Sequence, residues 1–458
     1  MSNDTSRRTP TVYGGEHVSV HILSDSPKGT SAYASITRNL ALGLIERGHD
    51  VTVTGFQTFF APENYEGIKI FPLLDPTDPN NPQIDQFKKT LKKTRADALI
   101  CIYQADSHFN IYSQLHYPTY FWVPVEGQGL PRIMSTDLKA PNIHAVSQTY
   151  AGQKELSADG IDSNVIYPGW DPQVFTQDPE SHCKWSTGLH MQTQDPVLLA
   201  RRGCRDCKGT CSHFEEEQII INHRGEEFSG IISDVSKLRE NLGVEFVVGC
   251  IATNMGLRKR IERLIEAFAL FNKDNRDSLL HIHTSLSSRG LPLHDIIKKY
   301  KVQDSAVFSY GEYPFSISDH AINQLYNYFD MNATASGAEG FGMTHLESMA
   351  IGKAQAAPNF GTFPELLGEN ERGLLASVAA TQLTENGTTR CLVDVESLAD
   401  KMEALCIDAN LRNKLGAAGA EWAKQFTWDK TVKQWDRALV EGEEVFKIVQ
   451  KISTKGDT

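Results

Sequence analysis

The chain has 458 residues, of which 40% are hydrophobic and 22% charged, and its formal net charge is -12. This composition is typical of a globular protein and excludes disordered, collagen-like and coiled-coil classes. The acidic balance provides no global positive field that would attract nucleic acid. We therefore expect no nucleic-acid partner, and any anionic ligand must be bound by a local group of residues.

Two observations bear on location. The longest apolar runs, at 98–103 and 246–252, are much shorter than the ~20 residues that span a bilayer. The N-terminal segment MSNDTSRRTPTVYGG lacks the apolar core of a signal peptide. We expect a cytoplasmic protein on this basis.

Residues 1–175 alternate β-branched strands with helices of apolar periodicity, which predicts a Rossmann-like, doubly wound α/β domain. A glycine-containing turn at 24–30 follows the first strand. The predicted strands are 17–23, 51–54, 98–103, 120–125 and 143–146, and the predicted helices are 34–47 and 84–95.

The helix predicted at 84–95 has two interpretations. Ile84, Phe87 and Leu91 share one helical face, and lysines cover the others. The pattern is that of a domain helix with a solvated face, and the strand that follows at once favours this view. Alternatively the basic face rests on anionic lipid, as a peripheral membrane contact at the cytoplasmic face.

Residues 176–242 interrupt the alternation and are expected to form an insertion. They hold four of the eight cysteines, namely Cys183, Cys204, Cys207 and Cys211. The Cys204-x2-Cys207 spacing with further thiols and His213 nearby supplies soft ligands of the kind that tetrahedral zinc prefers. A structural zinc is favoured, with an iron–sulfur cluster and unligated thiols as alternatives.

The alternation resumes over 243–429 and predicts a second doubly wound domain. Its strands are expected at 246–252, 279–284 and 307–309, and its helices at 261–271, 295–300 and 322–329. An amphipathic helix over 431–447 closes the chain.

The stretch EGFGMTHLESMAIGKA, residues 339–354, carries the most chemistry. Gly340, Phe341 and Gly342 lead into a helix, whose unpaired N–H groups and dipole suit a phosphate or a sugar hydroxyl. Glu339 and Glu347 can accept hydrogen bonds from paired hydroxyls. From spacing alone, Glu339 is equally well a surface loop residue and Glu347 an exposed helix residue.

This stretch, with GTFPEL at 361–366, resembles the glutamate-pair signature of retaining glycosyltransferases of family 4, which have the GT-B fold. Further similar motifs occur in the family's order: PKGTSAY, LIERGHDVTV, VIYPGWDPQVF, Lys259, QLYNYFD and Trp428. The resemblance implies two Rossmann-like domains facing a cleft, with the C-terminal helix at 430–458 packed back on the first domain.

By resemblance, Glu347 binds the ribose of a nucleotide-diphosphate sugar, Glu339 the donor sugar, and Gly340 to Gly342 offer backbone donors. Lys259 holds the diphosphate of a UDP- or GDP-sugar, where negative charge builds up as UDP or GDP leaves. Asn254 stands near the usual position of the family's arginine, and Arg258 or Arg260 is a substitute. The three basic residues are alternatively a solvated helix end.

The first-domain side of the cleft is implied by two weaker matches. Gly29, in the first turn, would place backbone amides near the donor phosphate or the acceptor, although such a glycine is also typical of a tight turn. The family often has a histidine where this chain offers Glu126, which either positions an acceptor hydroxyl or is an ordinary loop carboxylate.

These matches predict a retaining hexosyltransferase that uses a carbohydrate, lipid-linked or small-molecule acceptor. The sequence shows no recognisable DxD metal motif, which agrees with transfer assisted by Lys259 and no catalytic cofactor. A nucleotide-sugar epimerase of the same architecture and a non-catalytic nucleotide-sugar-binding protein are the alternatives.

Overall fold

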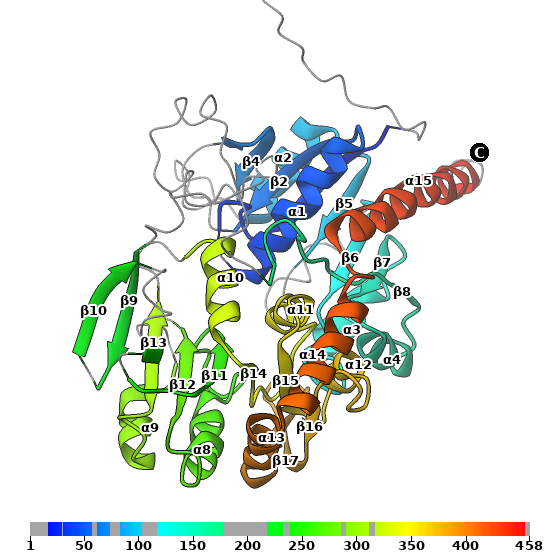
Figure 1. Cartoon of the computed structure of the whole chain (residues 1–458). Helices are drawn as coiled ribbons and strands as arrows, with labels where there is room; N and C mark the ends of the chain where they lie inside the picture. Colours follow the sequence, from blue (N-terminus) through cyan, green and yellow to red (C-terminus); the bar gives the residue numbers. More distant parts are fainter. Residues whose placement is uncertain are drawn as a thin grey trace, which may run out of the picture.

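The computed structural model describes residues 17–29, 31–56, 62–73, 83–102, 117–177, 218–224, 226–231, 239–240, 242–284, 290–310 and 317–453. These residues form two α/β domains, each built on an eight-stranded sheet (Figure 1). No helix within these ranges is both long and apolar enough to cross a membrane.

The first sheet has the strand order β3-β4-β2-β1-β5-β6-β7-β8, and all of its pairs except β3–β4 are parallel. Its strands are β1 (Ser19–Ser24), β2 (Asp50–Gly55), β3 (Glu63–Tyr65), β4 (Ile68–Pro72), β5 (Ala98–Cys101), β6 (Thr119–Val123), β7 (Ile143–Ser147) and β8 (Ser163–Val165). Its helices are α1 (Ala32–Glu46), α2 (Gln83–Thr94), α3 (Arg132–Leu138) and α4 (Tyr150–Ala158).

Alternating side chains of β6 show why both faces of this sheet carry helices. Trp122 is fully buried in the cluster that includes α1, whereas Phe121 and Val123 point into the cluster that includes α2, α3 and α4. A parallel strand buried on both faces reads as a continuous apolar run, as TYFWV does here.

The apolar side of α2 is used inside this core. Phe87 and Leu91 are buried, whereas Lys88, Lys92 and Lys93 are exposed. The described part of α2 therefore matches the domain-helix interpretation, and any lipid contact would depend on the basic side chains alone.

The second sheet has the order β10-β9-β13-β12-β11-β14-β15-β16. It contains β9 (Gln218–His223), β10 (Glu226–Ile231), β11 (Phe246–Ile251), β12 (Ser278–His283), β13 (Ala306–Tyr310), β14 (Met331–Ala333), β15 (Ala354–Pro358) and β16 (Leu374–Ala376). The pairs of β9 with β10 and β13 are antiparallel, and the others are parallel.

The edge strands correct the boundary expected for the insertion. Residues 218–231 lie inside the segment 176–242 that was expected to stand apart, yet they extend the second sheet beyond β13. Ile219 and Ile221 are buried, so this hairpin belongs to the core of the second domain. The four clustered cysteines lie outside the described residues.

The remaining elements complete the second domain. Its helices are α8 (Ile261–Phe271), α9 (Leu293–Tyr300), α10 (Asp319–Tyr328), α11 (Met343–Ala350), α12 (Phe363–Leu367), α13 (Val395–Ile407) and α14 (Ala409–Ala423). A separate antiparallel hairpin, β17 (Val378–Leu383) with β18 (Thr389–Val393), lies between β16 and α13.

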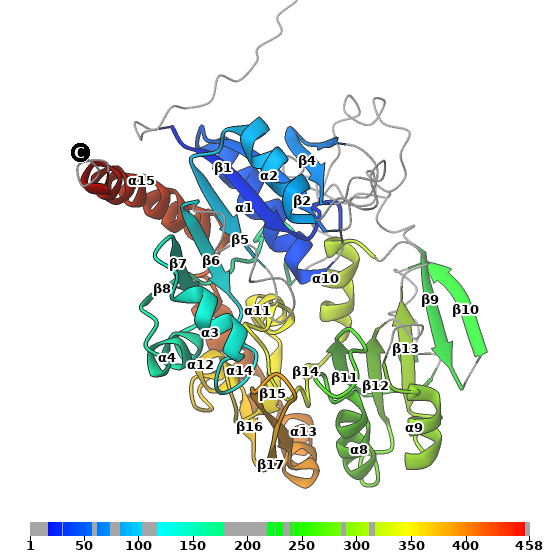
Figure 2. The same cartoon turned by 180° about the vertical axis from the view of Figure 1, so that it is seen from behind.

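The chain then crosses back, and the start of α15 (Trp428–Ser453) packs against the first domain, while its far end extends beyond the domain, as both views of the molecule show (Figures 1 and 2). The crossing is fixed by reciprocal backbone bonds of Trp170 with Phe426 and Trp428, at 2.9 and 3.1 Å. A Cβ on Gly169 would lie 2.5 Å from the Trp428 nitrogen, so this close approach requires glycine. Two segments of the chain, one around Trp170 and the other at 426–428, thus lie side by side where the chain passes between the domains.

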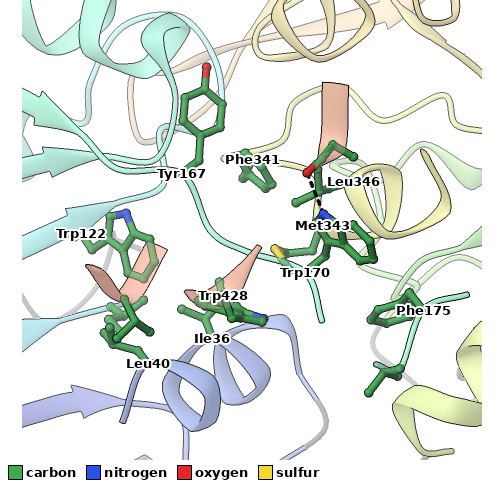
Figure 3. Packing of buried hydrophobic residues seen from close by; sticks show 14 of the residues in the cluster. Ile36, Leu40, Trp122, Tyr167, Trp170, Phe175, Phe341, Met343, Leu346 and Trp428 are labelled. Carbon is green, nitrogen blue, oxygen red and sulfur yellow. Dashed lines mark hydrogen bonds between the residues drawn. The ribbon is translucent and has the colours of Figure 1, made fainter. Parts of the chain in front are cut away.

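One apolar cluster covers the joint between the domains. Ile36 and Leu40 of α1 share it with Phe341 and Leu346 of the second domain, and Trp428 belongs to the same cluster (Figure 3). The cleft between the domains therefore has a packed base.

We expect Trp435→Ala to detach α15 from the first domain. Trp435 is fully buried and packs edge-on against Trp122, with ring centroids 5.2 Å apart. Removing the ring should cost about 3–5 kcal/mol of unfolding free energy, measured by urea denaturation. Trp435→Phe is the matched control, because the described residues provide no partner for the indole N–H and phenylalanine retains most of the packing. Equal stability of the two variants would contradict this account.

Candidate active site

A charged cluster lies where the two domains meet, and its central residue is Glu339. Lys259 Nζ lies 2.6 Å from Glu339 Oε1, and Arg258 Nη1 lies 3.4 Å from Glu339 Oε2. The same Arg258 nitrogen is 3.2 Å from Glu126 Oε1 of the first domain. Two cations and two carboxylates therefore form one connected group across the cleft.

Backbone hydrogen bonds within the second domain hold the segments that carry Arg258, Lys259 and Glu339 together. Gly337 N–H donates to the Arg258 carbonyl at 2.8 Å, and the Gly337 carbonyl accepts from Cys391 N–H at 2.9 Å. A Cβ on Gly337 would approach the Cys391 oxygen to 2.9 Å. The loop that carries Glu339 is thus fixed to the segment that carries Arg258 and Lys259, and the three side chains are positioned as a unit.

The electrostatics of the two carboxylates differ. Burial strongly opposes ionisation of Glu339, but Lys259 and Arg258 together outweigh it and lower its pKa to about 2. For Glu126, burial is also the largest effect, and it raises the pKa even though Arg258 opposes it. Glu339 is therefore a firmly ionised acceptor, whereas Glu126 is held less firmly as a carboxylate.

Tyr33 faces the same cluster and was not singled out from the sequence. It lies in the first turn of α1, whose N-cap Ser31 accepts from Ala34 N–H at 3.0 Å. The pKa of Tyr33 is raised well above its ordinary value, first by burial and then by the charge of Glu126. It stood in the motif PKGTSAY, but only the fold shows that it lies close enough to Glu126 and Glu339 for their charges to act on it.

Glu347 lies on α11 with a separate set of partners. Its Oε2 accepts from the Tyr326 hydroxyl at 2.9 Å. The pKa of Glu347 is raised to about 8, first by burial and then by the negative charge of nearby Asp319. The hydrogen bond from Tyr326 lowers the pKa by a smaller amount. It lines a pocket together with Arg38 of α1 and Asp319 of α10, which form an interdomain ion pair at 2.8 Å.

The turn before α11 contributes backbone only. Gly342 adopts φ 102° as the N-cap, without a side-chain capping bond. The Phe341 ring is buried against Tyr167, with centroids 5.7 Å apart. A Cβ on Gly340 would lie 2.4 Å from Pro124 Cβ of the first domain. The glycines thus permit a close approach of the two domains at the start of α11, where no side chain caps the helix.

Two candidate residues have other roles. Asn254 is buried, and its side-chain amide bonds both the carbonyl and the N–H of Leu291, at 2.9 and 3.0 Å. The expectation that it occupies a ligand-binding position is therefore not supported, because its polar atoms fix a loop. Arg260 bonds Gln382 at 2.6 Å, so Arg258 is the arginine of the cluster.

Gly29 lies in the turn before α1. Its N–H donates to the Ser26 carbonyl at 2.7 Å, and its own carbonyl accepts from Arg38 at 3.5 Å. This geometry is that of a tight turn held by a helix side chain, and a ligand contact of its amide stays a prediction.

Glu365 is a second residue whose role the sequence did not indicate. Its carboxylate accepts from the backbone N–H groups of Tyr150 and Ala151 at 2.9 and 2.7 Å, and from the hydroxyl of Tyr167. It thereby caps the N-terminus of α4 from the other domain. The motif GTFPEL contains it, but the partner helix is known only from the fold.

The proposed metal ligands Cys183, Cys204, Cys207 and Cys211 all lie outside the described residues. Within the described ranges, no group of three or more His, Cys, Asp and Glu side chains could hold a metal ion. The four other cysteines are unpaired, and three of them are buried.

The zinc prediction is checked by metal analysis. We expect about one zinc per purified chain and its loss from Cys204→Ser, because a CxxC pair supplies two of four tetrahedral ligands. Cys250→Ser is the matched control, since Cys250 is a buried thiol on β11. Protein without zinc would overturn the prediction, and protein containing iron would favour the cluster alternative.

Comparison with known proteins bears on this geometry. Residues 247–422 match the family described as "Glycosyl transferases group 1". An uncharacterized glycosyltransferase of Methanocaldococcus jannaschii is 33% identical over 97 residues, which are 21% of this chain and 24% of that protein. A GDP-mannose-dependent alpha-(1-6)-phosphatidylinositol monomannoside mannosyltransferase of Mycobacterium tuberculosis is 30% identical over 133 residues, 28% of this chain and 30% of that protein. These matches span less than a third of the relatives' lengths.

The similarity of folds extends further than that of sequences. Sucrose-phosphate synthase from Thermosynechococcus elongatus superposes with a TM-score of 0.67 over 94% of this chain and 100% of that chain, at 13% identity. The matched family segment begins at β11 and holds Arg258, Lys259, Glu339 and Glu347. The chain has the GT-B fold of two Rossmann-like domains, and its second domain carries the glycosyl transferases group 1 segment.

Proposed function

We propose that the protein is a retaining glycosyltransferase that transfers a hexose from a UDP- or GDP-sugar to a glycan, lipid-linked or small-molecule acceptor. The observation that carries the proposal is the cluster of Lys259, Arg258, Glu339 and Glu126 at the domain junction. The group 1 match over the second domain supports it.

The cluster suits this chemistry because the carboxylates of Glu339 and Glu126 hold the two cations in position before a ligand binds. Arg258 and Lys259 offset Glu339 and Glu126, so a bound diphosphate would bring negative charge to cations that are already positioned. As the glycosidic bond to phosphate breaks, charge grows on the leaving oxygen, and Lys259 and Arg258 can stabilise it. Glu339, ionised at neutral pH, is suited to accept hydrogen bonds from the donor sugar.

Glu347 is assigned to the nucleotide. A partly buried carboxylate on α11 can accept both hydroxyls of a ribose, and ionised it does so more strongly than protonated. Tyr326 would orient it through the 2.9 Å bond.

The test is incubation of the protein with a panel of radiolabelled UDP- and GDP-sugars, with and without methyl glycosides as acceptors. Release of free sugar or formation of a disaccharide with the donor's anomeric configuration supports the proposal. Conversion of one nucleotide sugar to its epimer, or binding without any product, overturns it. Glu339→Gln is the matched control, because it keeps the side-chain size and removes the charge between the two cations.

A further inference from the structure

The β17–β18 hairpin crosses from the second domain to the first. Gln128 and Thr389 exchange two backbone hydrogen bonds, Gln128 N–H to Thr389 O at 2.9 Å and Thr389 N–H to Gln128 O at 2.8 Å. A Cβ on Gly127 would lie 2.5 Å from the Thr389 oxygen, and Gly127 has φ 134°. The hairpin thus forms a bridge between the domains at the end of the loop that carries Glu126.

A pocket lies under this bridge, and its two walls differ in chemistry. The first-domain wall is apolar and consists of Pro124, Val125, Leu130, Pro131 and Met134. The hairpin wall is polar and consists of Asn386, Thr388 and Arg390, and Glu126 completes the lining.

The polar wall is built rigidly. Asn386 Oδ1 accepts from the Thr388 N–H at 3.3 Å and from the Thr388 hydroxyl at 2.8 Å, and the Thr384 N–H donates to the Thr388 carbonyl at 2.8 Å. These bonds fix the turn and use the oxygen of the Asn386 amide, while the described residues provide no partner for its NH₂. Polar groups on this wall are therefore held in place before a ligand arrives.

The pocket shares Glu126 with the charged cluster. Glu126 lines it and is also the residue 3.2 Å from Arg258, which in turn contacts Glu339. The charge of Arg390 is near enough to affect Glu126 as well. A molecule in this pocket would have one end at Glu126, next to the position assigned to the donor sugar.

We propose that this pocket, walled on one side by the β17–β18 hairpin, binds the acceptor and that the acceptor group it takes is a pyranose sugar. A pyranose has an apolar C–H face, which suits the wall of Leu130, Pro131 and Met134, and hydroxyls at its edge, which suit Asn386, Thr388 and Arg390. One hydroxyl meets Glu126. The assignment of the pocket to an acceptor depends on the proposed function, whereas its binding of a pyranose does not.

The experiment compares variants that fill the pocket with variants that do not. Leu130→Trp places a large ring in the pocket, and Ile133→Trp adds the same ring on α3 at a position that is 52% exposed and does not line it. Arg390→Met removes the guanidinium donors from the polar wall without adding bulk. The probes are methyl α-D-glucopyranoside and methyl α-D-mannopyranoside, observed by saturation-transfer NMR.

We expect saturation transfer to at least one glycoside in the wild type and in Ile133→Trp, and its loss in Leu130→Trp and Arg390→Met. Transfer of sugar to that glycoside should fall about tenfold or more in the two pocket variants, with hydrolysis of the nucleotide sugar to water changed less than about twofold. The hydrolysis reading also shows that a variant is folded.

Two results would overturn this inference. One is no saturation transfer to either glycoside in the wild type, and the other is undiminished saturation transfer to the glycoside in both pocket variants. Failure of the proposed function looks different. In that case the wild type binds a glycoside in this pocket and neither hydrolyses nor transfers any nucleotide sugar.

Discussion

Lys259→Met is expected to lower the turnover number for sugar transfer by about 100-fold or more, with a much smaller rise in the Michaelis constant for the donor. Lys259 Nζ lies 2.6 Å from Glu339, and its charge is needed most when the diphosphate departs. Methionine keeps the apolar stem, so packing changes little. Steady-state kinetics with the donor identified in the panel measures both constants.

The matched control for this variant is Lys298→Met, at an exposed position on α9 of the same domain. It should leave both constants unchanged. An equal factor of loss in the turnover number and in donor affinity would mean that Lys259 only binds the ground state, and full activity would remove it from the mechanism.

Glu347→Gln is expected to have opposite effects on stability and on function. Burial raises the pKa of Glu347 to about 8 in the folded chain from an ordinary 4.5, so its contribution to stability is complete below pH 4.5 and is lost as the pH rises through 8. Glutamine removes this loss and keeps an acceptor for Tyr326. The variant should therefore match the wild type near pH 4.5 and exceed it by a few kcal/mol near pH 9, as measured by urea denaturation.

Donor binding should respond in the other direction. If the ionised carboxylate accepts the ribose hydroxyls, binding removes the proton from Glu347, and wild-type affinity for the nucleotide rises between pH 6 and 8. In Glu347→Gln the affinity should be about tenfold weaker or more and almost independent of pH in that range. Calorimetric titration with UDP and GDP at several pH values measures this, and a pH-dependent variant would contradict the assignment. Tyr326→Phe is the control, because it removes only the orienting bond.

Much of the fold could be predicted because its determinants are local. The apolar run TYFWV, the helix stop before Gly48 and the alternation of strand and helix are all properties of neighbouring residues. The place of β9 and β10 in the second sheet was missed because an antiparallel edge hairpin near a cysteine-rich segment has no βαβ pattern. Its place is set by pairing with β13, more than 80 residues later in the chain.

The candidate site divides in the same way. Glu339 and Glu347 were indicated by one short motif and Lys259 by a separate match to the same family. Tyr33, Glu365 and Arg390 were not, since each lies near a group supplied by a distant segment: Glu126, the start of α4 and the segment 124–134, respectively. For Asn254, alignment by motif could not show that its amide is already bonded to Leu291.

The return of α15 to the first domain has a consequence for biosynthesis. Trp122 and Tyr120 belong to a sheet that is synthesised before the second domain, but the ring that covers them, Trp435, follows the second domain in the chain. Domains generally fold as they emerge, N-terminal first. Here the first domain must wait for the second to be synthesised before one of its faces is covered, so the nascent chain carries an exposed aromatic surface that chaperones can hold. Ribosome-bound chains halted before residue 428 should retain protease sensitivity in the first domain that the released protein lacks.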